Sequence, residues 1–516
     1  MLNVSVILED SAKRHSSKEA FINNDFHLSF LDLNNAANKI ANGLKRVGIK
    51  KGDKVALSCI NTPQFPMVYF GILKAGAIVV PLSILLKREE VAYHLTDSDA
   101  KLYFCFEGVP GLPMLEEGYA GFKAAPDCEH FYKISAKENK DSSKDLNTLN
   151  SLMKKESSVF ETVETISNDT AVIIYTSGTT GKPKGAELTH SNLLLNAILS
   201  ADIANTQPED TLLIVLPLFH IFAMTLLMNS GIYRGAKSIL LPRFDPETTL
   251  KMMEKHKVSI FAGVPTMYWG LLNHKDKNLN INAIANNLKI CISGGAALPV
   301  KVLENFETKY KVKILEGFGM SEGSPVVTFN HKENIRKPGS VGTAAWGIDV
   351  KVVDDNGNEL PVGEKGELVY KGHNVMKGYY KRPEVNAKVL KNGWLHSGDV
   401  AIKDEDGFFF IVDRTKDMII RGGLNVYPRE IEETMMQHES ISMVAVIGIK
   451  HEKFGEEIQA CVVLKEGKTI TENELIDWTK KRIAAYKYPR VIKFMDSLPT
   501  SATGKILKKE LKAYGN

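Results

Sequence analysis

The residue types of one loop suit the binding of a polyphosphate. A β-rich run ends at Thr176, and the eleven residues from Tyr175 to Gly185 include three glycines, four threonine or serine hydroxyls and two lysines. Glycine lets backbone N–H groups approach an anion closely, hydroxyls donate hydrogen bonds, and lysines supply positive charge. The loop is not a Walker loop, because Gly181-Lys182 is followed by Pro183 rather than by serine or threonine. We therefore predict a phosphate-binding loop of a different kind.

This loop follows one of many apolar runs that are separated by helical stretches. The runs read as buried strands: KVALSCI, AIVVPL, KLYFCF, TAVIIYTS, TLLIVLP, SILLP, VSIFAGVP and LKICISGG. Strands that alternate with helices indicate an α/β fold with largely parallel sheets. In such folds, ligands bind in the loops at the ends of the strands.

The pattern changes in the last third of the chain. From about Val341 short strands and turns predominate, with hairpin signals at Asn356-Gly357 and Asp406-Gly407. These features predict a β-rich subdomain. A smaller α/β pattern begins after Lys416, so we expect a linker near residues 413–417. The polar, charge-rich residues 134–158 are predicted to form a surface excursion.

Composition and charge limit the class of protein. The chain has 516 residues, of which 44% are hydrophobic and 24% charged, as expected for a globular protein of two or more domains. The net charge of +4 gives no reason to expect a nucleic-acid partner. Between Lys480 and Lys512, however, ten basic residues stand against two acidic ones. This tail is compatible with a solvated face, and it leaves contact with an anionic cofactor or peripheral membrane association open.

Cysteine usage and the absence of a signal sequence favour a cytoplasmic protein. The five cysteines are odd in number, far apart and without a CxxC pair, so neither disulfides nor a structural zinc site is expected. The N-terminus has no long apolar segment. Residues 211–233 are apolar and long enough to span a bilayer, but Pro217 and His220 lie near the middle. We expect a buried strand from Leu212 to Leu216, a turn and a buried helix instead.

The segment YTSGTTGKPKG resembles the signature loop of the adenylate-forming superfamily of acyl-CoA synthetases, luciferases and peptide-synthetase adenylation domains. Further matching segments are LPLFH, ISGGAALP, EGFGMSE, GWLHSGD, DRTKDMIIRGGLNVYPREIE and PTSATGKILKKEL, so the resemblance covers nearly the whole chain. It implies an N-terminal ATP- and acid-binding domain, residues 1–414, with mixed, largely parallel sheets, flanking helices and the β-rich subdomain. It also implies a small mobile α+β C-terminal domain, residues 415–516, that carries a catalytic lysine.

The resemblance implies a role in ATP binding for a set of loop residues. They are Thr176, Ser177, Gly178, Thr179, Thr180, Gly181, Lys184, Gly294, Gly295, Ala296, Glu316, Gly317, Phe318, Gly319, Met320, Ser321, Asp399, Ile411, Arg414 and Lys505. The implied catalytic residues are Lys505, Glu322 and Thr176. Glu322 is the implied Mg²⁺ ligand, since a carboxylate beside a triphosphate is costly unless it holds a cation. Lys505 would offset the repulsion between the attacking carboxylate and the α-phosphate.

The resemblance also implies where the acid and coenzyme A bind. His220, Met224, Val264 and Gly319 are implied around the acid, and Gly422 and Gly423 along the access path of the thiol after the C-terminal domain swings about a hinge at Lys416. The acid-binding segments are apolar, and Phe219-His220-Ile221-Phe222 lacks the aspartate that pairs with an amino acid. An apolar channel favours a fatty acid.

We therefore expect a ligase similar to bacterial long- or medium-chain fatty acyl-CoA synthetases. It would use ATP, Mg²⁺ and coenzyme A to form acyl-AMP and pyrophosphate, then the CoA thioester and AMP. One alternative is a ligase for an acyl or aryl acid that loads a carrier protein. A non-catalytic nucleotide-binding protein is the alternative of another class. The sequence leaves open the chain length, the pathway and the choice between monomer and homodimer.

Overall fold

Two large sheets form the N-terminal part of the protein. The structure, a computed structural model, describes residues 2–24, 26–136, 146–176, 182–331, 336–414 and 417–513. The first sheet contains β1 (Glu19–Asn23), β2 (Phe26–Ser29), β9 (Thr211–Ile214), β10 (Lys237–Leu240), β11 (Ile260–Gly263), β12 (Ile290–Ser293), β13 (Ile314–Gly319), β14 (Val326–Phe329) and β15 (Thr343–Ala344). The second contains β3 (Lys54–Ser58), β4 (Ile78–Pro81), β5 (Ala100–Phe106), β6 (His130–Ile134), β7 (Thr170–Thr176), β8 (Lys184–Thr189) and β18 (Gly378–Tyr379).

The order of strands shows crossover connections. It is β15-β14-β13-β12-β11-β9-β10-β1-β2 in the first sheet and β18-β8-β7-β4-β3-β5-β6 in the second. Most pairs are parallel, and antiparallel pairs occur toward the edges, as between β7 and β8. The α/β fold with mixed, largely parallel sheets is thereby confirmed.

Helices connect these strands and cover the sheets. They are α1 (Val6–Arg14), α2 (Phe30–Arg46), α3 (Gln64–Lys74), α4 (Arg88–Asp97), α5 (Met114–Lys123), α6 (Leu149–Met153), α7 (His190–Ile203), α8 (Ser230–Arg234), α9 (Pro246–Lys255), α10 (Pro265–Asn273), α11 (Ile281–Asn287), α12 (Val300–Tyr310) and α13 (Pro383–Val389). Helix α6 lies in the segment predicted as a surface excursion, and its Leu149 and Leu152 are buried. They are three residues apart and so share one face of the helix. Residues 137–145 of that segment lie outside the described residues.

The continuous apolar sequences of the first sheet reflect burial on both faces. In β9, Leu212 and Ile214 belong to the core shared with the second sheet, whereas Leu213 and the following Val215 belong to the core beneath α9–α12. Successive side chains of a strand point to opposite faces, so a strand covered on both sides needs apolar residues throughout.

The long apolar segment 211–233 folds into a strand, a turn and a helix, as predicted. The strand β9 is followed by a π-helix, η1 (Phe222–Asn229), that continues directly into α8. Most side chains of η1 are buried, including that of Met224. A π-helix closes i→i+5 hydrogen bonds, so each of its hydrogen bonds spans one more residue than in the α-helix that follows it. Within the described parts of the chain, no helix is long and apolar enough to cross a membrane.

The β-rich subdomain and the C-terminal domain follow. The former contains β16 (Ile348–Val353), β17 (Gly366–Gly372), β19 (Leu390–Lys391), β20 (Trp394–Lys403) and β21 (Phe409–Arg414). The latter contains β22 (Ile419–Arg421), β23 (Leu424–Val426), β24 (Ile441–His451), β25 (Gly455–Leu464), β26 (Val491–Phe494), α14 (Pro428–Met435), α15 (Glu472–Lys480) and α16 (Lys508–Ala513). Tight turns at Gly357 and Gly407, both at positive φ, confirm the hairpin signals. The boundary between residues 414 and 415 stays a prediction.

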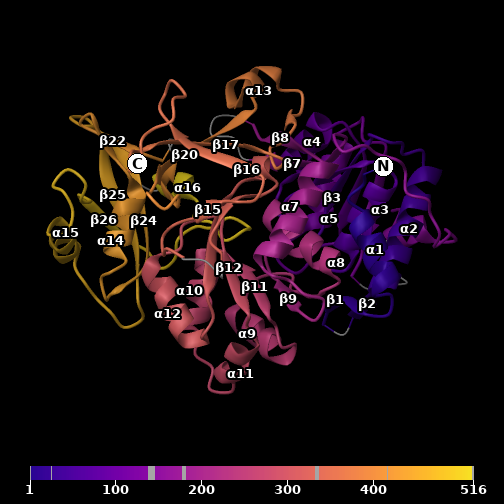
Figure 1. Cartoon of the computed structure of the whole chain (residues 1–516), viewed down its shortest axis with the longest axis horizontal. Coiled ribbons are helices and arrows are strands. Elements are labelled where there is room, and N and C mark those ends of the chain that lie inside the picture. Colours follow the sequence, from indigo (N-terminus) through magenta and orange to yellow (C-terminus); the bar gives the residue numbers. More distant parts are fainter. Residues whose placement is uncertain are drawn as a thin grey trace.

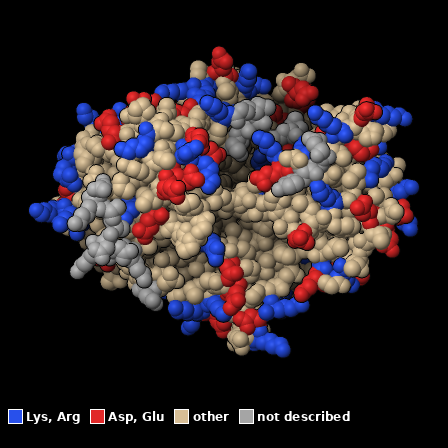
Figure 2. All heavy atoms as spheres, turned by 180° about the vertical axis from the view of Figure 1, so that it is seen from behind, with Lys and Arg blue, Asp and Glu red and all other residues tan. Residues whose placement is uncertain are grey.

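Figure 1 shows how these parts surround the centre of the molecule. The C-terminal sheet lies at one end and the helices α1–α5 at the other, with β16, β17 and β20 bridging above and α9–α12 below. The five cysteines are buried and free. On the face in Figure 2, basic and acidic side chains are intermixed.

Candidate active site

The carboxyl ends of the parallel strands gather many of the predicted site residues. His220 lies in the connection after β9, Val264 directly follows β11, Gly294–Ala296 follow β12, and Gly319 ends β13. These strands are parallel neighbours, so their carboxyl ends share one edge of the sheet. That edge is where an open α/β sheet binds its ligands.

The glycines after β12 keep a strip of backbone free of side chains. A Cβ atom at Gly294 would lie 3.4 Å from the ring of Phe222, and one at Gly295 would lie 3.6 Å from Val264 Cγ1. Phe318, from the end of β13, is partly buried against the same core. Exposed backbone beside aromatic rings suits a flat heterocycle, and binding of adenine here stays a prediction.

Glu322 forms a buried cluster of hydrogen bonds beside the phosphate-binding loop. Its side chain is in the short 3₁₀ helix η2 (Ser321–Gly323), and the residue is 5% exposed. Its Oε1 accepts hydrogen bonds from Thr176 Oγ1 at 3.2 Å and from the hydroxyl of Tyr379 at 2.6 Å. Burial and this carboxylate raise the pKa of Tyr379 well above its ordinary value, so the phenol remains a donor. Lys184 Nζ lies 5.2 Å from the centroid of the Tyr379 ring.

The loop residues Ser177, Gly178, Thr179, Thr180 and Gly181 lie outside the described residues, as does Lys416. The described ends of the loop are fixed by the antiparallel pairing of β7 with β8, in which Thr176 lies opposite Lys184. The loop itself stays a prediction from the sequence. The structure places its two described ends, Thr176 and Lys184, next to Glu322 and Tyr379.

Glu316 lies deeper in the same region. The residue is 5% exposed, and its Oε1 accepts a hydrogen bond of 3.3 Å from the N–H of Gly339. Burial raises the pKa of its carboxyl group to about 7, against the opposing charge of Arg429. Arg429 belongs to the C-terminal domain and also donates to the carbonyl oxygens of Gly339 and Ile411. This carboxyl group thus lies near the contact between the two domains.

Asp399 and Arg414 are brought together by the pairing of β20 with β21. They lie opposite each other in the antiparallel register, and Arg414 Nε is 3.1 Å from Asp399 Oδ1. Asp399 is 3% exposed, whereas the Arg414 side chain is 39% exposed. A buried carboxylate beside a more open guanidinium can accept hydrogen bonds from hydroxyl groups, and ribose binding here stays a prediction.

The loop that carries Lys505 is docked on the N-terminal part. Thr266, in α10, donates a hydrogen bond of 3.0 Å to the carbonyl oxygen of Gly504. The loop is closed by hydrogen bonds between Ser501 and Lys505. Burial and the nearby charge of Lys505 lower the pKa of His220 to about 4. The structure therefore docks the Lys505 loop of the C-terminal domain on the N-terminal part, where the charge of the lysine acts on His220.

The predicted thiol face lies elsewhere. Gly422 and Gly423 form the turn between β22 and β23, and the N–H of Gly422 donates to the carbonyl oxygen of Phe454 at 2.9 Å. The space around a Cβ atom at Gly423 would be open. The contacts found for these two glycines stay within the C-terminal domain.

Sequence reasoning missed three residues of the site: Tyr379, Thr266 and Arg429. Tyr379 lies in the segment GHNVMKGYYKRPE, whose clustered aromatic residues were a usable signal. Arg429 lies in the matching segment DRTKDMIIRGGLNVYPREIE, which was a usable signal, whereas Thr266 has no such signal because it acts through a backbone carbonyl distant in sequence.

Comparisons with known proteins agree with this geometry. Residues 8–380 match the family described as AMP-binding enzyme, and residues 430–505 match its C-terminal domain. A long-chain-fatty-acid–CoA ligase of Bacillus subtilis (strain 168) is 38% identical over 527 residues, covering 98% of this chain and 93% of that protein. A feruloyl-CoA synthase of an Amycolatopsis species is 35% identical over 489 residues, covering 94% and 93%. The crystal structure of ATP-bound MatB from Rhodopseudomonas palustris aligns with a TM-score of 0.91 at 31% identity, covering 100% of this chain and 99% of that chain.

The chain therefore belongs to the AMP-binding enzyme family of adenylate-forming enzymes. Its reaction is of the acid–CoA ligase type, in which a carboxylic acid is adenylated with ATP and then transferred to a thiol. The names of the relatives point to different acids, so the family alone leaves the acid open.

Substitution of Gly504 should separate docking of the Lys505 loop from folding. Gly504 has φ +79°, and a Cβ atom there would lie 2.9 Å from Val264 Cγ2 and 3.0 Å from Thr266 Oγ1. We expect Gly504→Ala to lower acid-dependent ATP–pyrophosphate exchange by about tenfold, because the loop can no longer seat on α10.

The matched control is Gly467→Ala. Gly467 also has a positive φ, +72°, but the space around its Cβ position is open. Both variants carry the same backbone strain, of roughly 1 kcal/mol. Equal exchange rates in the two variants would contradict a role for the docked contact.

Proposed function

We propose that this enzyme activates a fatty acid. It forms fatty acyl-AMP and pyrophosphate from ATP, and then transfers the acyl group to the thiol of coenzyme A with release of AMP. The observation that carries the proposal is the docking of the Lys505 loop beside His220, at the edge of the sheet where the acid and the nucleotide would meet.

Lys505 supplies the positive charge that the first step needs. An anionic carboxylate must approach an anionic α-phosphate, and a cation between them offsets the repulsion and stabilises the transition state. His220 supports this role because its imidazole, with a pKa of about 4, is neutral at pH 7 and does not repel the lysine. Its Nδ1 accepts a hydrogen bond of 3.3 Å from the N–H of Phe222, which leaves the proton on Nε2 as a donor.

The surroundings of His220 favour an aliphatic acid. Met224 is fully buried and Val264 is 3% exposed, and the adjoining segment Ile221-Phe222 offers no carboxylate for an amino group. Each methylene group transferred from water to such surroundings contributes about 0.8 kcal/mol. The similarity to a long-chain-fatty-acid–CoA ligase supports the same acid class, and the similarity to a feruloyl-CoA synthase supports an aryl acid as the second candidate.

Glu322 fits a Mg²⁺ ion bound together with ATP. Mg²⁺ in nucleotide sites takes one or two carboxylates and the phosphate oxygens, and Glu322 offers one buried carboxylate beside the phosphate-binding loop. Both hydrogen bonds found for it end on Oε1, so the carboxylate keeps acceptor capacity with which it would hold the metal. When bound, Mg²⁺ neutralises charge on the phosphates. Thr176 and Tyr379 hold the carboxylate in place.

The second step needs a different face of the C-terminal domain. Gly422 and Gly423 keep their contacts within that domain in the arrangement observed, while Lys505 is at the site. We propose that the domain swings about Lys416 after adenylation, which withdraws Lys505 and brings the two glycines toward the acyl group. The space around the Cβ position of Gly423 is open, which is compatible with the approach of a thiol there.

The acid is tested by ATP–pyrophosphate exchange over a panel of acids. We expect kcat/KM to rise with chain length from eight to sixteen carbons, by up to about fourfold per methylene. Ferulate, benzoate, malonate and amino acids serve as comparison acids. Thioester formation is then measured with free coenzyme A and with an acyl carrier protein. A higher kcat/KM for ferulate, or a thioester on the carrier protein alone, would refute the proposal.

Removal of the Lys505 side chain should affect the two steps unequally. We expect Lys505→Ala to reduce adenylation by about 100-fold, because a preorganised charge at the transition state is lost. Thioester formation from supplied acyl-AMP should stay within about threefold of wild type. Lys509→Ala, at an exposed position of the neighbouring α16, is the control. Similar losses in both steps would argue against the assigned role.

The metal role of Glu322 is tested by Glu322→Gln. The amide oxygen of glutamine still accepts from Thr176 and Tyr379, while the negative charge is removed. We expect the Mg²⁺ concentration for half-maximal adenylation to rise by at least about tenfold, with a much smaller change in KM for the acid. Glu384→Gln, at an exposed position of α13, is the control. An unaltered Mg²⁺ requirement would rule the role out.

A further inference from the structure

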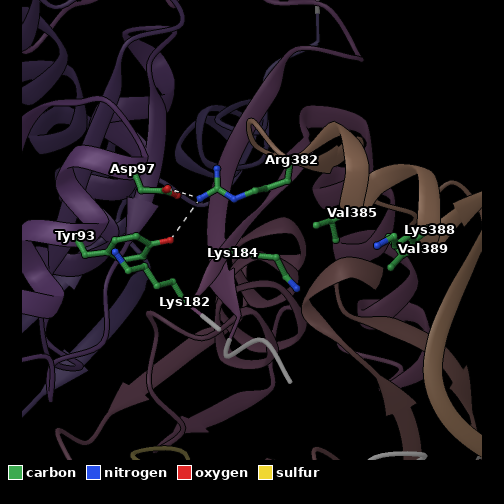
Figure 3. A pocket seen from close by; sticks show the side chains of 8 residues that line it. All are labelled: Tyr93, Asp97, Lys182, Lys184, Arg382, Val385, Lys388 and Val389. Atoms are coloured by element: carbon green, nitrogen blue, oxygen red, sulfur yellow. Dashed lines mark hydrogen bonds and ion pairs between the residues drawn. The ribbon is translucent and has the colours of Figure 1, made fainter. Parts of the chain in front are cut away.

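A pocket that includes Lys182 and Lys184, at the described end of the phosphate-binding loop, is lined mainly by charged side chains. Its volume is about 610 Å³, and it lies between α4, the start of β8 and α13. The lining residues are Tyr93, Asp97, Lys182, Lys184, Arg382, Val385, Lys388 and Val389. Figure 3 shows that they come from both walls of the opening, with Lys184 between them.

The pocket is joined to the loop by fixed contacts. Tyr93 donates a hydrogen bond of 2.7 Å to the carbonyl oxygen of Pro183, and Lys182 Nζ lies 5.1 Å from the centroid of the Tyr93 ring. Because Lys182, Pro183 and Lys184 are consecutive, these contacts hold the returning end of the loop against α4. Lys184 faces the pocket and also lies above Tyr379, the partner of Glu322. Lys184 is thus shared between the pocket and the region where the phosphates of ATP are proposed to bind.

The charge in the pocket is strongly positive. Four cations line it against one carboxylate, so its net charge is 4 − 1 = +3. Asp97 is already paired with Arg382 and accepts a hydrogen bond from Tyr175 at 2.9 Å. Within the described residues, Lys182, Lys184 and Lys388 form no salt bridge. Three lysines therefore remain to bind an anion.

We propose that this pocket is a subsite for pyrophosphate as it leaves the enzyme. The inference rests on the proposed function, since it assigns a site to the first product of that reaction. Pyrophosphate displaced from the α-phosphate is held by Lys182, Lys184 and Lys388 before it reaches solvent. Lysine binds phosphate groups as a point charge on a flexible side chain, which suits a site that binds pyrophosphate only briefly.

Other ligands fit the pocket less well. An acyl chain would find only Val385 and Val389 as aliphatic partners and would desolvate five charged groups. Coenzyme A shares phosphate chemistry with pyrophosphate, and the experiment separates the two. Lys388 is the best position to alter, because it lines the pocket from α13 and is exposed, outside the phosphate-binding loop.

The test compares Lys388→Ala and Lys388→Glu with Lys391→Ala and Lys391→Glu. Lys391 is an exposed lysine three residues further along the chain that does not line the pocket. Binding of inorganic pyrophosphate to the full-length enzyme without acid is measured by calorimetry, and its inhibition constant is measured in the forward reaction. We expect the dissociation constant and the inhibition constant of pyrophosphate to rise by about threefold in Lys388→Ala and about tenfold in Lys388→Glu. These substitutions change the charge by one and two units at a partly exposed contact. The Lys391 variants should match wild type.

The same preparations give KM for ATP and for coenzyme A. The proposal requires a change in the pyrophosphate constants at least about threefold larger than the change in either KM. Equal effects at Lys388 and Lys391, or a rise in KM for coenzyme A without a change for pyrophosphate, would overturn it. If no acid on the panel supports adenylation, the proposed function fails. Calorimetry still decides the pocket, since it requires no turnover.

Discussion

The hydrogen bond between Thr266 and the carbonyl oxygen of Gly504 is the contact on which the arrangement of the site depends. The N-terminal sheets supply the glycine backbone after β12, the aromatic ring of Phe318 and the buried carboxylate of Glu322. None of the residues predicted to surround the acid in these sheets is a lysine. That charge comes from a loop of another domain, and the loop can lie flat on α10 only because residue 504 has no side chain. We therefore expect a Cβ atom at residue 504 to hinder the docking that brings the two halves of the site together.

Electrostatics then sets the state of each group around this contact. A lysine can approach His220 at low cost because burial already keeps the imidazole neutral, and the lysine lowers its pKa further. Glu322 is stabilised by two hydroxyl donors rather than by a cation of the protein, which would compete with a metal. Positive charge lies instead on Lys184 and on the other basic side chains that line the pocket described above.

Much of the fold could be predicted because the deciding signals are local. Apolar runs of five to eight residues identified the strands buried on two faces, and Asn-Gly and Asp-Gly pairs identified the hairpins. Pro217 and His220 lie near the middle of the apolar segment 211–233 and argue against a membrane span. The segment could therefore be read as a strand, a turn and a buried helix. Its π-helical hydrogen bonding could not be read from the sequence, since it depends on the packing of the folded chain, in which η1 contacts α7.

Residues of the candidate site could be predicted only where a charged residue type within a motif indicates its chemical role. Glu322, Asp399 and Lys505 were recognised in motifs, whereas Tyr379, Thr266 and Arg429 act through partners more than 50 residues away in sequence. A tyrosine that donates to a carboxylate is indistinguishable in sequence from a tyrosine that fills a core. Only the folded chain shows that Tyr379 reaches Glu322 and lies beneath Lys184.

The π-helix η1 has a consequence for how such an enzyme changes its acid during evolution. Successive residues of an α-helix are rotated by about 100° around its axis. Loss of one residue from η1 would restore α-helical hydrogen bonding and turn the preceding residues of η1, including Met224, relative to α8, while the turn between β9 and η1 takes up the change. If Met224 contacts the acid, as the sequence predicts, a single-codon deletion would change the side chains that face the acid without rebuilding the sheet. A change in length of one residue in η1 would thus alter which of its side chains face the predicted acid-binding region.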